Sequence, residues 1–237
     1  MLIGGFDMKQ KTVARKLIVK EEPHSIISEQ YRVLRTNIKF SSAKKMKSFV
    51  VTSAIQGEGK STTAANLAQL FAEEKQNVLF IDADLRKPTV HFTFNLQNTI
   101  GFSLALSHQK AIEECIQKTD DPYLDVMTSG PIPPNPSELL GSERLNEVKQ
   151  QLEEQYDWII FDTSPLLAVT DTQLLANRVD GVVLVVDMNK THKKMVKKAQ
   201  NLIENAEGKI LGVVLNNVAS SNMNYYSSKY YGSYVQK

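Results

Sequence analysis

Four side chains in this 237-residue sequence stand where chemistry on phosphate can occur: Lys60, Asp82, Asp84 and Asp162. The aspartates lie at the ends of short apolar runs typical of buried strands, and Lys60 follows such a run after a turn that contains glycine. A lysine attracts phosphate, whereas carboxylates hold a divalent metal or accept a proton. These residue types therefore predict chemistry on phosphate groups, with Mg²⁺ as the metal.

The lysine belongs to a stretch, residues 49–62, that reads FVVTSAIQGEGKST. Gly57 and Gly59 can adopt backbone angles that other residues resist, so the loop can curl with its N–H groups inward. Lys60 would reach the β- and γ-phosphates, and the Ser61 hydroxyl would hold Mg²⁺. The usual pattern is G-x-x-x-x-G-K-[ST], and Ala54 replaces its first glycine, so an unrelated turn is the alternative. The predicted nucleotide contacts are Gly57, Glu58, Gly59, Lys60, Ser61, Thr62 and Arg86.

The carboxylates end two further apolar runs, VLFIDADLR at 78–86 and WIIFDTSP at 158–165. Asp82 is our candidate for the general base, and Asp84, two residues on, can project on the same side and orient Mg²⁺. Asp162 would hold Mg²⁺ through a water molecule. A lone aspartate at a strand end is commonly a cap, but three beside a phosphate loop favour catalysis. Arg86 could neutralise phosphate charge or pair with Asp84.

Strands and helices alternate along the chain, which predicts a doubly wound, mainly parallel sheet of the P-loop class. In such sheets, ligands bind beyond the carboxyl ends of the strands, so the motifs should meet at one edge. We expect a flexible basic arm at 1–24, one domain at 25–217 and a flexible tail at 218–237. Within the domain, we expect one helix over 137–156 and an irregular excursion over 88–120.

Composition excludes several classes of protein. The formal charge of +2 carries no general nucleic-acid signal, so we expect no nucleic-acid partner. Cys115 is the only cysteine, which excludes disulfides and fits a reduced, cytoplasmic setting. No apolar run approaches the roughly 20 residues of a membrane span, and no signal peptide is visible. The basic arm is either a solvated terminus or a contact for anionic lipid or an acidic partner.

Two segments could serve interactions rather than chemistry. Glu29, Arg32 and Arg35 form E-x-x-R-x-x-R in an expected helix, as either a solvated face or a self-association surface. The tail is rich in tyrosine, serine and asparagine, and is either an edge strand or a flexible segment that presents phenolic hydroxyls. Its tyrosines are Tyr225, Tyr226, Tyr230, Tyr231 and Tyr234.

These motifs together resemble the bacterial tyrosine kinases, the CpsD/CapB-type enzymes of exopolysaccharide synthesis in Gram-positive bacteria. The resemblance covers about residues 25–237 and includes EQYRVLRTNI at 29–38 and TSGPIPPNPSELL at 128–140. The three nucleotide motifs alone would imply only the larger MinD/ParA-like P-loop class. The chain departs from the family at Gln56 and at Ser164, where proline is frequent, but neither change removes a phosphate, metal or base ligand.

The resemblance implies an ATP-dependent protein tyrosine kinase that phosphorylates its own tail and regulates capsule synthesis. It implies that Asp82 and Asp84 supply the base and a metal contact, and that the E-x-x-R-x-x-R helix assembles a ring. It also implies a membrane adaptor of the polysaccharide co-polymerase type, a cognate phosphatase and a peripheral position at the inner membrane face. The alternatives are a MinD/ParA-like ATPase switch and a non-catalytic nucleotide-binding regulator of a polysaccharide assembly complex.

Overall fold

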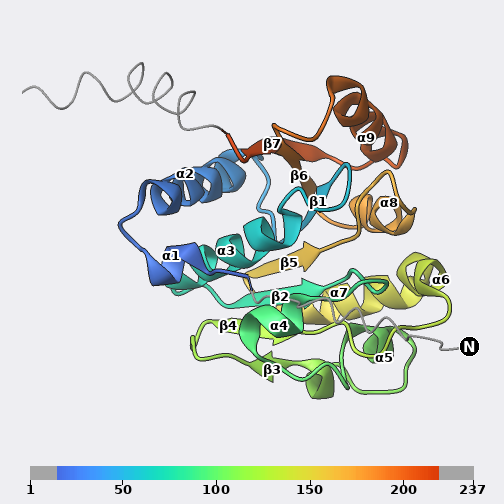
Figure 1. Cartoon of the computed structure of the whole chain (residues 1–237). Helices are drawn as coiled ribbons and strands as arrows, with labels where there is room; N and C mark the ends of the chain where they lie inside the picture. Colours follow the sequence, from blue (N-terminus) through green and yellow to red (C-terminus); the bar gives the residue numbers. More distant parts are fainter. Residues whose placement is uncertain (1–14, 219–237) are drawn as a thin grey trace, which may run out of the picture.

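The computed structural model describes residues 15–218, which form a seven-stranded sheet between two layers of helices (Figure 1). Six strands run parallel, and only the short β3 at one edge is antiparallel to its neighbour. The predicted doubly wound, mainly parallel sheet is therefore confirmed. The strands are β1 (Ser48–Ser53), β2 (Val78–Asp82), β3 (Gln117–Lys118), β4 (Leu124–Met127), β5 (Trp158–Asp162), β6 (Gly181–Asp187) and β7 (Ile210–Asn216).

The strand order, β3-β4-β2-β5-β1-β6-β7, places the three motif strands side by side as β2, β5 and β1. In this register Asp82 lies directly opposite Asp162, and Val51 lies opposite Asp162 on the other side. Parallel strands end at the same edge of a sheet, so all three motifs open onto one site. The expected convergence of the motifs is confirmed.

Alternate side chains of the buried strands pack into two apolar cores, one on each face of the sheet. Phe49 and Val51 face a core shared with α2, α3 and α4, whereas Val50 faces a core shared with α5–α9. The first layer contains α1 (Ile18–Glu21), α2 (Ile26–Phe40), α3 (Lys60–Glu73) and α4 (Val90–Phe94). Those of the second layer are α5 (Phe102–Leu106), α6 (Pro136–Gly141), α7 (Glu143–Gln155), α8 (Asp171–Ala176) and α9 (Lys193–Asn205).

The single helix expected over 137–156 is wrong, because the structure divides this segment into α6 and α7. Ser142 between them is extended, at φ −74° and ψ 158°. Arg178 donates to the carbonyl oxygens of Leu140, Gly141 and Ser142, which satisfies the open end of α6. A distant arginine thus stabilises a break that the apolar spacing did not indicate. Pro136, just before the helix expected over 137–156, is the first residue of α6, where proline is favoured.

Residues 15–24, expected in the flexible basic arm, pack on the domain, whereas residues 1–14 lie outside the described residues. Val19 is buried, and its N–H donates to Asn66 Oδ1 at 3.1 Å. Arg15 donates to the Thr89 hydroxyl at 2.5 Å. These partners are remote in sequence, so a polar composition concealed an ordered segment.

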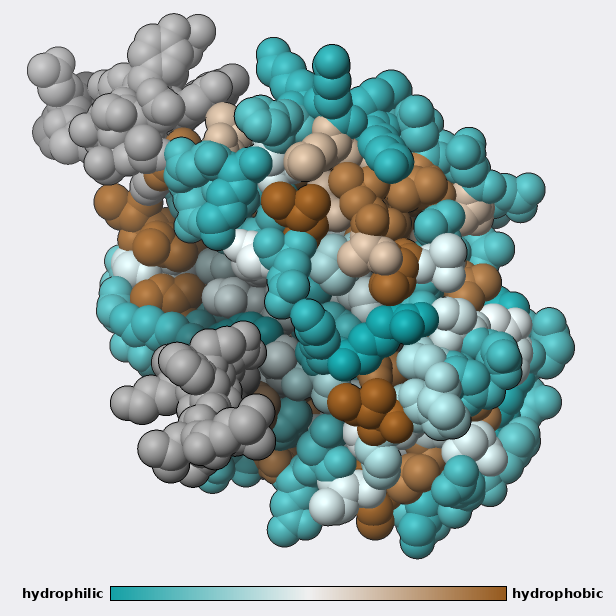
Figure 2. All heavy atoms as spheres, turned by 45° about the vertical axis from the view of Figure 1, so that its right-hand side comes forward, coloured by the Kyte–Doolittle hydropathy of each residue, from teal (hydrophilic) through white to brown (hydrophobic). Residues whose placement is uncertain are grey.

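The excursion over 88–120 consists of short elements, as its weak periodicity predicted: α4, α5, one turn of 3₁₀ helix at Glu113–Cys115, and β3. In the second layer, α9 buries Ala199 and Ile203 and exposes its lysines. Figure 2 shows hydrophilic residues across the top of this face, where α9 lies. Among residues 15–218, no helix combines the length and the apolar character that crossing a membrane requires.

Candidate active site

The phosphate loop joins β1 to α3 and has the backbone that its glycines predicted. Gly57 and Gly59 have φ of 83° and 92°, in the left-handed region that favours glycine. A Cβ at Gly59 would also lie 2.2 Å from Asn216 Nδ2, so a side chain there would displace the Asn216 amide. α3 begins at Lys60, which directs the positive end of a 14-residue helix toward the loop. The segment therefore has both features of an anion site.

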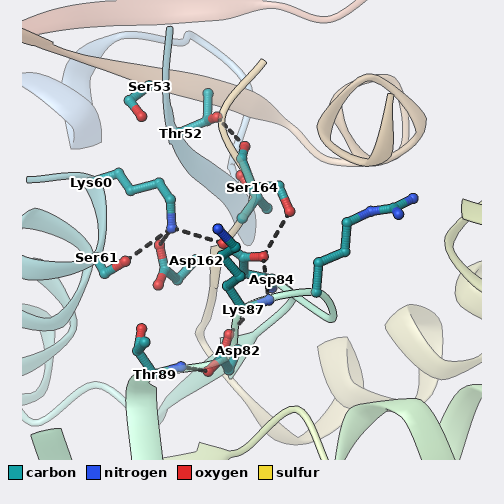
Figure 3. A network of polar contacts seen from close by, with 12 residues as sticks. Thr52, Ser53, Lys60, Ser61, Asp82, Asp84, Lys87, Thr89, Asp162 and Ser164 are labelled. Carbon is teal, nitrogen blue, oxygen red and sulfur yellow. Dashed lines mark hydrogen bonds and ion pairs between the residues drawn. The ribbon is translucent and has the colours of Figure 1, made fainter. Parts of the chain in front are cut away.

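Lys60 lies among the carboxylates, and only 11% of its side chain is exposed (Figure 3). Its Nζ is 3.3 Å from Asp162 Oδ1, 3.3 Å from Asp84 Oδ2 and 3.0 Å from Ser61 Oγ. Burial alone would lower the pKa of Lys60, but the negative charges of these carboxylates outweigh it and raise the pKa. Lys60 is therefore a permanent cation at the point where the three motifs meet.

Asp82 is fully buried and held by three backbone N–H groups. Its Oδ1 accepts from Asp84 at 3.2 Å, and its Oδ2 accepts from Thr89 and Val90 at 2.9 Å each. Burial, and then the charge of Asp162 on the adjacent strand, raise the pKa of Asp82 to about 7. A carboxyl group with such a pKa can take up and release a proton near neutral pH, which a general base requires.

The arrangement also fits a divalent metal. Asp162 Oδ2 is buried and has no hydrogen-bond partner, and such an orphaned acceptor is costly unless a ligand satisfies it. Asp84 Oδ2 and Ser61 Oγ both contact the Lys60 ammonium, so the site already concentrates hard oxygen donors around a cation. Within residues 15–218, no group of three or more His, Cys, Asp or Glu forms a protein-only metal site. This pattern suits Mg²⁺, which typically takes one or two carboxylates and completes its shell with water and phosphate.

Two residues predicted to contact the nucleotide are bound elsewhere. The Glu58 carboxylate is buried and accepts from the Ile55 N–H at 2.7 Å, the Asp187 N–H at 2.9 Å and the Thr191 hydroxyl. It therefore braces the loop against the end of β6, and its side chain is not available to a nucleotide. The partners at Asp187 and Thr191 lie about 130 residues away, so nothing local in the sequence indicated this role.

Arg86 pairs with Asp171 and not with Asp84, the protein partner expected for it. Its guanidinium is bidentate on Asp171, at 2.8 and 3.0 Å, and donates to Ser137 at 2.9 Å. It thereby links the loop after β2 to the starts of α6 and α8. Asp171 was overlooked in the sequence, where its only signal is an acidic residue in the first turn of an expected helix.

The E-x-x-R-x-x-R residues of α2 are engaged within the chain. Arg32 pairs with Glu29 at 2.6 Å and donates to the Pro23 carbonyl at 2.8 Å. Arg35 pairs with Glu74 at 2.9 Å and donates to the Leu70 carbonyl, and only 14% of its side chain is exposed. The exposed residues of α2 include apolar ones: Ile26, Ile27, Val33 and Phe40. The five predicted acceptor tyrosines lie outside the described residues.

Comparisons with known sequences identify the relatives of this chain. A family model described as an AAA domain matches residues 46–214. Tyrosine-protein kinase YwqD of Bacillus subtilis is 49% identical over 220 residues, which cover 92% of each chain. Tyrosine-protein kinase CpsD of Streptococcus agalactiae is 37% identical over 198 residues, which cover 83% of this chain and 85% of that protein.

Solved structures give the same result for the fold. The chimerical protein CapA2B2 has a TM-score of 0.82 at 44% identity, over 87% of this chain and 92% of that one. The cell-division ATPase MinD of Pyrococcus furiosus has a TM-score of 0.63 at 22% identity, over 74% of each chain. The second likeness confirms the P-loop fold alone, and the P-loop makes this a nucleotide-binding chain.

Proposed function

This chain belongs to the bacterial protein-tyrosine kinases, and on that premise we propose that the Lys60–Asp82–Asp84–Asp162 site transfers the γ-phosphoryl group of ATP to tyrosines of the chain's own C-terminal tail. The observation that carries the proposal is a buried carboxyl group whose pKa is about 7, close to a largely buried lysine at the mouth of a phosphate loop. Phosphoryl transfer to a phenol needs these parts: a base for the proton and cations for the phosphate charge.

In the proposed reaction, the loop N–H groups and Lys60 hold the β- and γ-phosphates. Asp82 accepts the phenolic proton as the tyrosine oxygen bonds to the γ-phosphorus. The bond from that phosphorus to the β–γ bridging oxygen breaks, and ADP leaves. Ser61, Asp84 and Asp162 would hold Mg²⁺, which when bound neutralises charge on the phosphates.

The root of the tail lies next to the phosphate loop, which supports the choice of acceptor. The Asn216 side chain at the end of β7 donates to the Glu58 carbonyl at 2.9 Å. Tyr225 follows nine residues later, a reach of at most about 30–32 Å. This reach extends to the site of a closely packed neighbour, whereas return to the chain's own site needs a sharp reversal. We therefore propose that phosphate passes between subunits.

A mixing experiment tests this route. Full-length Lys60→Met protein supplies the tail, and a chain truncated after residue 217 supplies the intact site, with MgATP present. We expect phosphate on Tyr225, Tyr226, Tyr230, Tyr231 and Tyr234 of the Lys60→Met chain, mapped by mass spectrometry. Wild-type protein alone and Lys60→Met alone are the controls. A Lys60→Met tail that stays unmodified, while wild-type protein phosphorylates itself, would establish the intramolecular route.

We further propose that unmodified chains form a ring through α2 and that tail phosphorylation dissociates it. Five phosphotyrosines add about −7.5 to −10 charges to a chain whose formal charge is +2, so neighbouring tails would repel. Light scattering before and after MgATP treatment should show an oligomer and then a monomer. An unchanged mass after full phosphorylation would refute the idea.

Variants of α2 test the interface itself. Arg32→Ala with Arg35→Ala should give monomers without ATP, but Arg35 also anchors α2 to α3 within the chain. Phe40 is 82% exposed, so Phe40→Ser separates the two effects: we expect monomers with an unchanged melting temperature. If the Phe40 variant stays oligomeric and only the arginine variant dissociates with a lowered melting temperature, the arginines act by folding α2.

The proposal also covers the partners of the kinase and its location in the cell. We propose that a membrane adaptor activates the kinase at the inner face of the membrane, that a phosphatase resets it, and that the cycle regulates capsular polysaccharide synthesis. A MinD-like switch would hydrolyse ATP without phosphotyrosine, and a non-catalytic regulator would bind ATP and do neither. Phosphotyrosine mapping with the candidate adaptor and MgATP distinguishes all three functions.

A further inference from the structure

The two carboxylate oxygens of Asp84 have different surroundings (Figure 3). Oδ1 accepts from the Ser164 hydroxyl at 2.9 Å and from the Lys87 N–H at 3.1 Å. Oδ2 lies 3.3 Å from Lys60 Nζ and faces the cation. Asp84 is 6% exposed, so water does not compete freely for either oxygen. One oxygen is thus held by the protein, and the other is directed at the reacting region.

Ser164 is itself firmly held. Its carbonyl oxygen accepts from the Thr52 hydroxyl at 2.9 Å and from the Thr172 hydroxyl at 2.6 Å. Thr52 lies on β1 and Thr172 on α8, and all three residues are almost fully buried. The backbone at Ser164 is therefore tied to both neighbouring elements. The backbone that carries the hydroxyl is therefore fixed, and the hydroxyl donates to one charged acceptor, Asp84 Oδ1.

We propose that Ser164 is a positioning residue that holds the Asp84 carboxylate with Oδ2 turned toward Mg²⁺. The inference rests on the proposed function, in which Asp84 is a metal contact. The last torsion of an aspartate is broad, so with the Lys87 N–H as the only donor to Oδ1 the carboxylate could rotate to follow the mobile Lys60 side chain on Oδ2. The second donor, Ser164, defines the carboxylate plane. Partners of this kind that orient a metal ligand typically change metal affinity by about 10–100-fold when removed.

Nothing in the sequence indicated this role for Ser164. Ser164 attracted notice only as a departure from the proline of the family pattern, and proline carries no hydroxyl. Its acceptor is 80 residues away in the chain and is reached only because β2 and β5 are neighbours.

Metal binding tests the proposal without relying on catalysis. Mn²⁺ is titrated into full-length protein with saturating ADP, and bound metal is measured by electron paramagnetic resonance. Ser164→Ala should raise the Mn²⁺ dissociation constant about 10–100-fold. Ser164→Thr, which restores the hydroxyl, should stay within about threefold of wild type, and Ser164→Cys, a weak donor of similar size, should lie between them. ADP affinity in EDTA should not change.

Thr163→Val is the matched control. Thr163 is equally buried and donates to the Val51 carbonyl at 3.2 Å, so this variant also loses a buried hydroxyl contact, but not one to Asp84. We expect its Mn²⁺ affinity to match wild type. If Thr163→Val weakens Mn²⁺ as much as Ser164→Ala does, the effect is general loosening and the proposal is wrong. The cysteine variant keeps the test decisive if the alanine variant does not fold.

Asp84→Asn separates this inference from the function on which it rests. If Asp84→Asn weakens Mn²⁺ and Ser164→Ala does not, Asp84 holds the metal without help, and only the positioning role is lost. If neither variant weakens Mn²⁺, the assignment of Asp84 as a metal contact is itself wrong. Parallel losses in Asp84→Asn and Ser164→Ala, with recovery in Ser164→Thr, are the result we expect.

Discussion

Asp82→Asn will lower tyrosine phosphorylation by about 10²–10⁴-fold, the usual contribution of a general base. The amide is close in size to the carboxylate but cannot take the phenolic proton. It keeps one oxygen for the paired Thr89 and Val90 N–H groups but loses the acceptor of the Asp84 N–H, so the melting temperature is recorded on the same protein. The measurement is the initial rate with MgATP and a tail peptide, beside ADP binding to the same protein. We expect ADP affinity to change little.

The pH dependence provides an independent check on Asp82. A general base works only when it is deprotonated, and burial beside Asp162 raises the pKa of Asp82 to about 7. The value of kcat/KM for MgATP reports groups of the free enzyme, so it should fall as the pH decreases through about 7. An ordinary aspartate would give a flat profile down to about pH 4. A wild-type profile that stays flat from about pH 8 to 5, or a near-normal rate in the Asp82→Asn protein, would remove Asp82 from the base role.

Lys60→Met will reduce autophosphorylation below detection. Removing one positioned donor to a developing charge commonly costs about 10²–10³ in kcat. Loss of Lys60 should lower kcat further, because its ammonium also balances the negative charges of Asp84 and Asp162, at 3.3 Å each. Methionine preserves the apolar stem and removes only the charge. The measurement is phosphotyrosine formed over time, with mass and melting temperature recorded on the same sample.

Lys60→Arg is the matched variant for charge. Arg retains the positive charge but carries a larger planar head, which does not reproduce an ammonium in contact with two carboxylates and a hydroxyl. We expect partial recovery of ADP binding and little recovery of transfer. A Lys60→Met protein that still phosphorylates a tail peptide within about tenfold of wild type would contradict the assignment of Lys60 to the phosphates.

The sequence by itself determined the class of fold and the chemical core of the site. Apolar runs at β1, β2 and β5 are local signals, because a strand buried on both faces must be apolar throughout. The glycines of the loop are equally local, since their left-handed backbone depends on their own lack of a side chain. Asp82 and Asp162 end such runs, and Lys60 follows one after the glycine loop, so parallel pairing of the strands and that loop bring them to one edge.

Only the tertiary structure decided which side chains support that core. Glu58 is bound by Asp187 and Thr191, Arg86 by Asp171, and Ser164 by Asp84, and each pair is separated by at least 80 residues. The break between α6 and α7 likewise depends on Arg178, and the docking of residues 15–24 depends on Asn66 and Thr89. Spacing reports neighbours within one helix or strand, whereas these polar contacts exist because the sheet order brings distant segments together. A buried polar group must find a partner wherever the fold supplies one, and that choice is absent from any local pattern.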